Sequence, residues 1–244
     1  GRDDKKNEKG FANLHYPGMK TDPDEGRTPL SELVLWHFAA QVESLGEEAQ
    51  RKLMSASVLI LGATPLGVRL AKRLSEVGIG RIGVFGDSPA TGAHQFIKPS
   101  EGIVLSAIAE LKKWMKAEAS WVQFEPFSGE SLDRQLDDVV RGFGIVVATD
   151  LWSVEIGEHA LASAKEHGIS FLSAKTSLLG ARISTGELLE VSESIGAVSI
   201  VLDQVTQSIA GSIFAMALAG KAAAVFETIE LKKDSWNLEV NQKK

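Results

Sequence analysis

The chain has 244 residues, of which 44% are hydrophobic and 24% are charged, and this composition is ordinary for a globular domain. Its formal net charge of −6 gives no reason to expect nucleic acid as a partner. The sequence contains no cysteine, which excludes disulfides, thiolate metal ligands and a cysteine nucleophile within it. We predict no membrane span, because the longest apolar run, residues 209–225, is interrupted by Gly211, Gly220 and Lys221.

Residues 1–30 are polar and carry charges of both signs, as in GRDDKKNEKG and KTDPDEGRTP. Such a segment buries too little apolar surface to fold alone. We therefore predict a polar N-terminal extension over residues 1–30 and one folded domain over residues 31–244. The first residue, Gly1, leaves open whether the chain begins at a processed end or at a cut.

The first half of the domain alternates helical and strand patterns. Leu33, Trp36, Phe38 and Val42 recur at roughly helical spacing, and residues 47–54 form a second short helical pattern. A continuous apolar run at 57–62 predicts a buried strand, 66–77 an amphipathic helix, and 81–85 a second strand. This order predicts a right-handed parallel crossover.

The second half continues in the same way. We predict helices over 104–116, 132–141, 155–167 and 209–226, strands over 121–127, 144–149 and 169–175, antiparallel strands within 179–191, and a last strand over 225–231. These elements predict an α/β class fold, doubly wound and Rossmann-like. We expect a mostly parallel sheet with helices on both faces and an antiparallel extension.

The stretch VLILGATPLG, residues 58–67, resembles the phosphate-binding turn of a dinucleotide fold. Gly62 and Gly67 occupy the first and last glycine positions, whereas Thr64 and Pro65 replace the middle ones. Proline has no N–H to donate to an anion, and its ring adds bulk. We therefore favour a tight packing turn over a working ATP site.

An acidic residue at the end of the second strand commonly binds the ribose in such folds. Here the strand is followed by Gly86 and Asp87, so that the carboxylate stands one residue later than expected. A shift of one residue along a strand points a side chain to the opposite face. Asp87 is thus a candidate ribose ligand in a displaced position.

Several stretches together resemble the ThiF-type adenylyltransferases and the activating enzymes of ubiquitin-like proteins. They are LGEEAQRKLMSASVLILGATPLGVRLAKRLSEVGIGRIGVF, GAHQFI, GIVVATD, KEHGISFLSAKTSLLGARIS and AGSIFAMALAG, and they extend over nearly everything after residue 36. GAHQFI and the segment before the first strand most resemble the non-catalytic half of the heterodimeric activating enzymes.

The resemblance implies ATP- and magnesium-dependent adenylation of a protein carboxylate, with cations for the phosphates. Most of the implied cation positions hold other residues here. Ala40 and Glu43 stand where a helix before the first strand carries arginines, Ile103 where a lysine is expected and Glu155 where an arginine is expected, with only Lys98 near another arginine position.

The implied magnesium aspartate matches Asp150 at the end of GIVVATD. An aspartate at a strand end is also a common helix N-cap, so we favour a capping or loop role over magnesium binding. Gly62, Gly67, Asp87 and Asp150 together form a remnant nucleotide site that we do not expect to function. We predict no catalytic residue and no resident cofactor, with ATP and magnesium as the alternative.

Other side chains give weaker signals. His37, His94, His159 and His167 lack ligand spacing, so we predict no metal site. Trp114 and Trp121 flank a lysine-rich segment and are either core residues or interface anchors.

These features predict a catalytically inactive activating-enzyme-like protein that serves as an interaction subunit of a heteromeric assembly. The first alternative is the non-catalytic half of a ubiquitin-like-modifier activating enzyme, although Ala40 stands where the resemblance implies an arginine. The second alternative is a small-ligand-binding Rossmann protein. The expected partners are proteins, either a same-fold subunit or a large complex. The compartment stays open: cytosol or nucleus for an enzyme half, mitochondrion for a subunit of an organelle complex.

Overall fold

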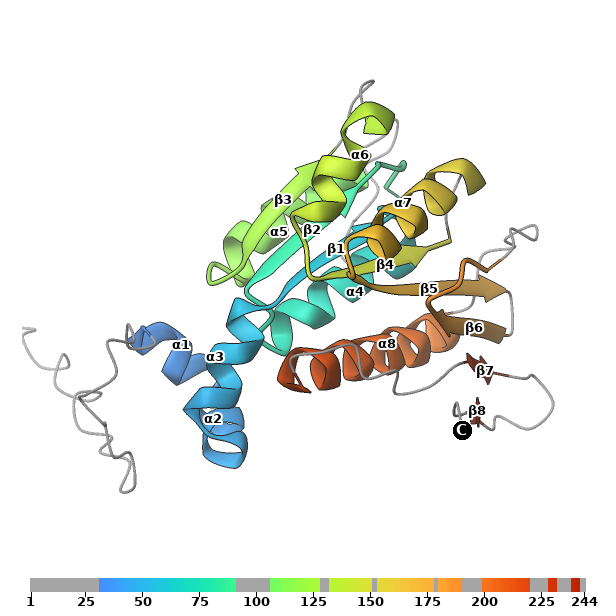
Figure 1. The fold of residues 1–244 in the computed structure, drawn as a ribbon. Helices are drawn as coiled ribbons and strands as arrows, with labels where there is room; N and C mark the ends of the chain where they lie inside the picture. Colours follow the sequence, from blue (N-terminus) through green and yellow to red (C-terminus); the bar gives the residue numbers. More distant parts are fainter. Residues whose placement is uncertain are drawn as a thin grey trace, which may run out of the picture.

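The protein folds as an eight-stranded sheet covered by helices on both faces (Figure 1). The structure, a computed structural model, describes residues 31–90, 106–127, 132–150, 153–177, 180–189, 199–219, 228–231 and 238–241. The predicted extension over residues 1–30 lies outside this range. The strands are β1 (Ser57–Leu61), β2 (Arg81–Phe85), β3 (Gln123–Phe127), β4 (Ile145–Thr149), β5 (Ser170–Ser177), β6 (Gly180–Thr185), β7 (Thr228–Leu231) and β8 (Leu238–Asn241).

The strand order is β3-β2-β1-β4-β5-β6-β7-β8. Strands β1 to β5 pair in parallel, whereas β6, β7 and β8 extend the sheet in antiparallel pairs. The predicted doubly wound α/β fold with an antiparallel extension is therefore confirmed.

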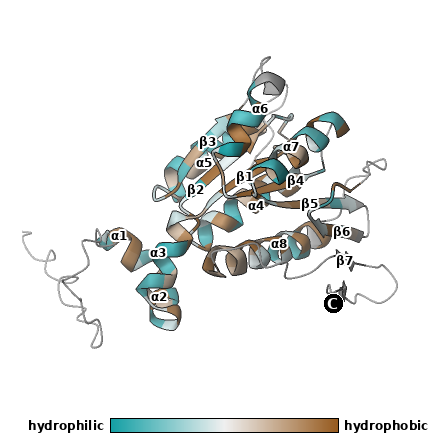
Figure 2. Ribbon diagram, in the orientation of Figure 1, coloured by the Kyte–Doolittle hydropathy of each residue, from teal (hydrophilic) through white to brown (hydrophobic). Residues whose placement is uncertain are grey.

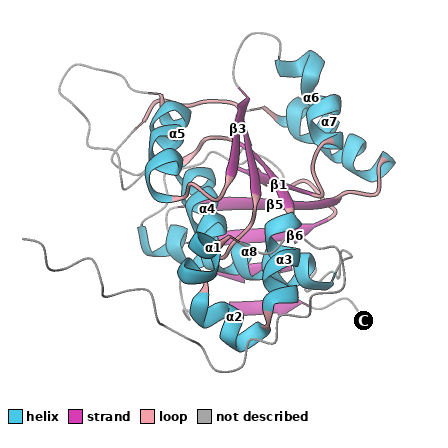
Figure 3. Ribbon diagram, turned by 90° about the vertical axis from the view of Figure 1, so that its left-hand side faces the viewer, coloured by secondary structure: helices cyan, strands magenta, loops and turns pink. Residues whose placement is uncertain are grey.

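The helices are α1 (Glu32–His37), α2 (Ala39–Leu45), α3 (Glu47–Ser55), α4 (Pro65–Glu76), α5 (Ala107–Glu118), α6 (Leu132–Arg141), α7 (Val154–Glu166) and α8 (Ser199–Ala219). Strand β1 shows how they divide between the faces, because its side chains alternate. Val58 and Ile60 join a core with α4, α5 and α8, whereas Leu59 and Leu61 join a second core with α6 and α7. Figure 3 shows these two helix layers on either side of the sheet.

Some element limits differ from the sequence predictions. Helix α5 begins at Ala107, where the Ser106 hydroxyl caps it. Strand β3 begins at Gln123, two residues after Trp121, whose indole N–H donates to the Ser75 carbonyl at 3.1 Å. The region predicted as antiparallel strands contains a single strand, β6, within its described residues. Strand β8 was not predicted; its four residues, LEVN, are too short for a clear pattern.

Helix α8 begins at Ser199, ten residues before its predicted start at Ile209. Within the described residues it alone has the length and composition to cross a bilayer. Half of that apolar window is buried inside the domain, where α8 packs on α4. This burial against α4 is typical of a core helix of a globular domain.

Helices α1 to α3 precede the sheet and pack at the end where its parallel strands begin (Figure 1). Val34, Phe38 and Val42 form a small separate core, against which Trp121 packs. The Gly80 N–H donates to the Leu53 carbonyl at 3.3 Å, and the Arg81 N–H donates to the Ala56 carbonyl at 3.2 Å. These bonds join the end of α3 to the start of β2.

Candidate functional site

The candidate site lies at the carboxyl ends of β1 and β4. These two strands are neighbours, but the chain leaves β1 toward β2 on one side and continues from β4 toward β5 on the other. Ligands of doubly wound folds bind where the strand order reverses in this way. The predicted residues Gly62 and Asp150 each follow one of the two strands.

Close packing requires the two glycines of the β1–α4 turn. Gly62 has a φ of +106°, and a Cβ there would lie 2.7 Å from the Thr149 carbonyl oxygen. A Cβ on Gly67 would lie only 2.0 Å from the carbonyl oxygen of Gly62. The turn thus has no room for larger residues, whether or not an anion binds.

The polar groups of this turn bond to one another. The Thr64 hydroxyl caps α4 by accepting from the Gly67 N–H at 3.1 Å, and Pro65 is the first residue of the helix. The Thr149 hydroxyl lies 3.1 Å from the Leu61 carbonyl oxygen. From the segment after β2, the Ser88 hydroxyl donates to the Ala63 carbonyl at 2.6 Å.

Asp87 bonds to the first turn of a neighbouring helix, α5, whose N-cap is Ser106. Its Oδ1 accepts from the N–H groups of Ser88 at 2.8 Å and Ile108 at 3.1 Å, and its Oδ2 accepts from the Ser106 hydroxyl at 2.5 Å. The carboxylate therefore ties the end of β2 to the N-terminus of α5. This is the favourable place for a negative charge on a helix.

Asp150 occupies a strained position and is bonded to β5. Its φ of +38° is unusual for a residue other than glycine. Oδ1 accepts from the Thr176 N–H at 2.8 Å, and Oδ2 accepts from the Thr176 hydroxyl at 2.7 Å. Burial raises the pKa of the Asp150 carboxyl, whereas these hydrogen bonds and the positive charge of Lys175 act in the opposite direction.

The capping alternative predicted for Asp150 is wrong, because Ser153 is the N-cap of α7 and accepts from the Ile156 N–H at 3.4 Å. Asp150 lies in the bend directly after β4, and the choice between a loop role and magnesium binding stays a prediction.

Of the described positions that match the implied cations, Ala40 and Glu43 lie away from this turn, whereas Glu155 lies on the same side as the turn, in the helix that follows β4. Ala40 and Glu43 lie on α2, and the chain passes from there through α3 into the amino end of β1, the opposite end of the strand from the turn. Glu155 lies in the first turn of α7 and accepts from the Ser153 hydroxyl at 2.6 Å. Lys98 and Ile103 lie outside the described residues.

The remaining candidates also have structural partners. The rings of His37 and Trp121 lie 3.9 Å apart between centroids, and His167 Nε2 accepts from Arg141 at 3.0 Å. Trp114 and Trp121 pack against the core, and Lys72 lies 4.6 Å above the Trp114 ring. These contacts favour the core alternative for both tryptophans; His94 lies outside the described residues.

Sequence reasoning missed Thr176, Lys175 and Ser88, which complete the site. Thr176 reaches Asp150 from the neighbouring strand, and Ser88 reaches the turn from the end of β2. Both contacts depend on how parallel strands lie beside each other, so no local motif carries them. These residues could be found from the sequence only by aligning all strands of the sheet with those of a ThiF-type protein.

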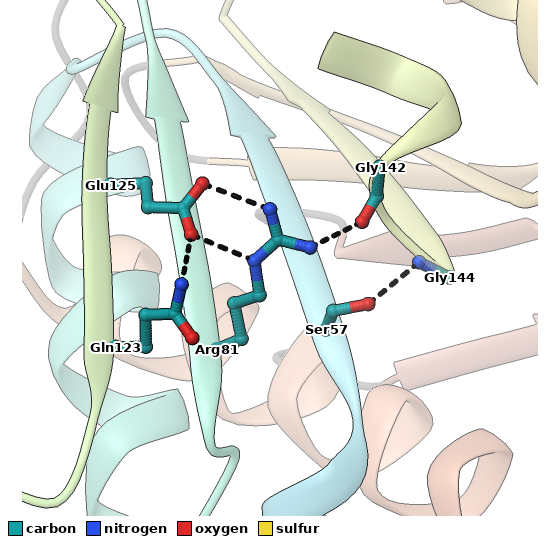
Figure 4. Close-up of polar contacts among 6 residues, drawn as sticks. All are labelled: Ser57, Arg81, Gln123, Glu125, Gly142 and Gly144. Atoms are coloured by element: carbon teal, nitrogen blue, oxygen red, sulfur yellow. Dashed lines mark hydrogen bonds and ion pairs between the residues drawn. The ribbon is translucent and has the colours of Figure 1, made fainter. Parts of the chain in front are cut away.

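A second polar cluster lies where β2 and β4 begin (Figure 4). The Arg81 guanidinium donates two hydrogen bonds of 2.9 Å to the Glu125 carboxylate and a third to the Gly142 carbonyl. The guanidinium also lies 4.3 Å from the centre of the Phe143 ring. The hydrogen bond from Arg81 holds the pKa of the Glu125 carboxyl below its ordinary value, so the cluster is a charged clasp between β2, β3 and the segment before β4.

Solved structures with the same architecture are similar to this chain. E. coli MccB with ATP superposes with a TM-score of 0.69 and 12% identity, covering 84% of this chain and 71% of MccB. PaaA superposes with a TM-score of 0.68 and 15% identity, covering 91% of this chain and 77% of PaaA. The chain has the ThiF/E1-like fold.

The sequence comparison agrees with this ThiF/E1-like fold. The adenylyltransferase and sulfurtransferase MOCS3 of Anopheles gambiae is 29% identical over 129 residues, which are 50% of this chain and 29% of MOCS3. The matched region is thus less than a third of that relative's length. No protein-family model matches the chain.

Proposed function

We propose that this ThiF/E1-like chain is catalytically inactive and serves as an interaction subunit of a heteromeric protein assembly. Inactivity is supported most directly by the remnant site, where polar groups that a nucleotide or metal would need are used within the chain. The Gly67 N–H is bonded to Thr64, and both oxygens of Asp150 are bonded to Thr176.

The residue changes support the same proposal. Adenylation needs positive charge around the phosphates, and preorganised donors of this kind contribute several kcal/mol each to transition-state binding. Ala40, Ile103 and Glu155 stand at positions where the ThiF/E1 resemblance implies cations. Loss of these charges is compatible with a retained fold, because the β1–α4 turn packs through Gly62 and Gly67.

The relatives indicate which activity an inactive copy of this fold would lack. MccB has been crystallised with ATP, and MOCS3 is named an adenylyltransferase. An inactive copy of this fold keeps its surfaces for protein contact even when its crevice no longer binds nucleotide. A role through protein contact is therefore the function that best fits these residues.

Nucleotide binding tests the proposal. Thermal unfolding and titration calorimetry of the full chain with Mg-ATP should show no stabilisation and no heat of binding. A ligand at a hundred times its Kd would stabilise the fold by about 2.7 kcal/mol, so that binding would be plain to see. E. coli MccB serves as the positive control, because its structure contains ATP.

Saturable binding of Mg-ATP by the wild-type chain would contradict the proposal, and so would ATP–pyrophosphate exchange. We also expect Pro65→Gly alone not to create ATP binding, because it restores a backbone N–H but none of the missing cations.

The non-catalytic half of a ubiquitin-like-modifier activating enzyme is the second candidate. The absence of cysteine from the whole chain favours it, because in such a pair the partner carries the thiol. Size separation and mass spectrometry of the natively purified chain distinguish the two. A same-fold partner with a catalytic cysteine, together with a ubiquitin-like protein, would establish the second candidate.

A further inference from the structure

Helix α1 presents an unusual pair of side chains to solvent. Trp36 is 74% exposed and Leu33 is 52% exposed, the two highest exposures among the large hydrophobic side chains of the described residues. Leaving them in water forfeits the free energy of burying both side chains. They lie three residues apart on α1, so they share one face of the helix.

The opposite face of the same segment is already in use. Val34, Phe38 and Val42 are at most 5% exposed and pack with Met54 and Trp121. The Phe38 N–H donates to the Val34 carbonyl and the Val42 N–H to the Phe38 carbonyl, so the turns of α1 and α2 follow one another nearly without interruption. The segment thus has an inner stripe that attaches it to the domain and an outer stripe, Leu33, Trp36 and Ala40.

The charge beside the outer stripe is of one sign. Helices α1 and α2 contain two glutamates, Glu32 and Glu43, and no lysine or arginine, whereas on α3 Glu47 pairs with Arg51 at 3.1 Å. Glu32 and Glu43 are exposed on the same two helices. Figure 2 shows the hydrophobic colouring of α1 beside hydrophilic stretches of α2 and α3.

We propose that the outer stripe of α1 and α2 is the docking surface for a different protein that presents an apolar groove rimmed by lysine or arginine. This inference deepens the proposed interaction role and rests on it. A helix that offers anchors at i, i+3 and i+7 fits a groove of this kind, and tryptophan is one of the side chains enriched at the centre of such contacts. The glutamates select a basic rim and speed encounter with it.

Site-specific crosslinking of the full chain in its native cells tests the surface. Benzoylphenylalanine placed at Leu33 should crosslink to one different protein. The same probe at Val154 is the matched control, because Val154 is 40% exposed but lies at the start of α7, away from the stripe. The control position should not capture that protein.

The captured protein is then purified and titrated against the chain. Trp36→Ala should weaken binding by about tenfold or more. Glu43→Lys and added salt should lower the association rate, whereas Val154→Ala should change neither quantity. Circular dichroism and the unfolding midpoint should be unchanged in all three variants, because each side chain is exposed.

Three outcomes would overturn the inference. They are crosslinks only to residues 1–30 of the same chain, crosslinks only to a second copy, and a partner whose affinity ignores both Trp36→Ala and salt. If the chain sits in a heteromeric assembly but the captured contacts lie elsewhere, this surface is wrong and the proposed function stands. If the chain binds and turns over ATP, the proposed function fails whatever the crosslinks show.

Discussion

The two ends of the parallel strands differ in how their polar groups are used. At the carboxyl end, Asp150 accepts hydrogen bonds from Thr176, and Thr64 accepts one from the Gly67 N–H. At the amino end, helices α1 to α3 pack against the sheet, and Arg81 and Glu125 form the charged clasp. Trp36 remains exposed to solvent there. In a ligand-binding doubly wound protein the carboxyl end carries the function. Here we expect the amino end to carry it.

The largest expected effect comes from the turn at the carboxyl end. Gly67→Ala places a Cβ against the backbone oxygen of Gly62 at 2.0 Å, so that strand or helix must move. We expect a loss of about 3 kcal/mol or more in the free energy of unfolding, measured by urea denaturation. Gly211→Ala is the control: nothing lies within 4 Å of its Cβ, and we expect about 0.5–1 kcal/mol of added stability. A stable Gly67→Ala protein would mean that the turn is not held by packing.

Two tryptophans near the amino end should behave in opposite ways. Trp121→Ala removes the ring that contacts His37 and Phe38 and the bond to the Ser75 carbonyl, which should cost about 3 kcal/mol. Trp36→Ala removes a solvent-exposed ring and should change stability by less than about 0.5 kcal/mol. Thermal and urea unfolding of the isolated chain compare them directly. Equal losses would show that Trp36 is a structural residue and has no need of a partner.

The contribution of the charged clasp to the free energy of unfolding depends on pH. The pKa of Glu125 is lowered in the folded state, so its contribution is complete at neutral pH and disappears as pH falls below its ordinary value of 4.5. Glu125→Gln should therefore cost about 1 kcal/mol at neutral pH, a modest value because solvent screens a partly exposed pair. The difference between variant and wild type should shrink in acid. A difference that persists at low pH would assign the effect to packing.

The smallest change in stability is expected at Asp150. Its carboxylate lowers stability at neutral pH, whereas the carboxylate of Glu125 raises it. Burial raises its pKa in the folded state, so the ionised carboxylate is a cost at neutral pH that vanishes as pH falls through the raised pKa. Asn keeps the hydrogen-bonding shape and tolerates a positive φ. Asp150→Asn should be neutral, or more stable by up to about 1 kcal/mol, in urea denaturation at neutral pH. A variant that loses stability only in the presence of magnesium and ATP would instead identify Asp150 as a metal ligand.

The fold was largely predictable because its signals are local. Buried runs such as residues 57–62 and the amphipathic helix after Gly62 specify elements by composition and spacing. The partners of Asp87 and Asp150 were not predictable, because Ile108 and Thr176 meet them only after helices and strands have docked. The sequence also directed attention to Trp114 and Trp121, which the structure buries partly, and away from Trp36, which it exposes. The residue type alone does not show whether a tryptophan faces the core or the solvent.

Helix α8 covers α4 late in the chain, and this order has a consequence for synthesis. Arg69 on α4 bonds to Asp203 on α8, a contact between residues 134 positions apart. During translation, the apolar stripe of α4 therefore leaves the ribosome long before the helix that shields it. The nascent chain must keep this stripe from aggregating for the time that more than half of the protein is being made. Completion of α8 is thus the step at which this stripe of α4 becomes covered.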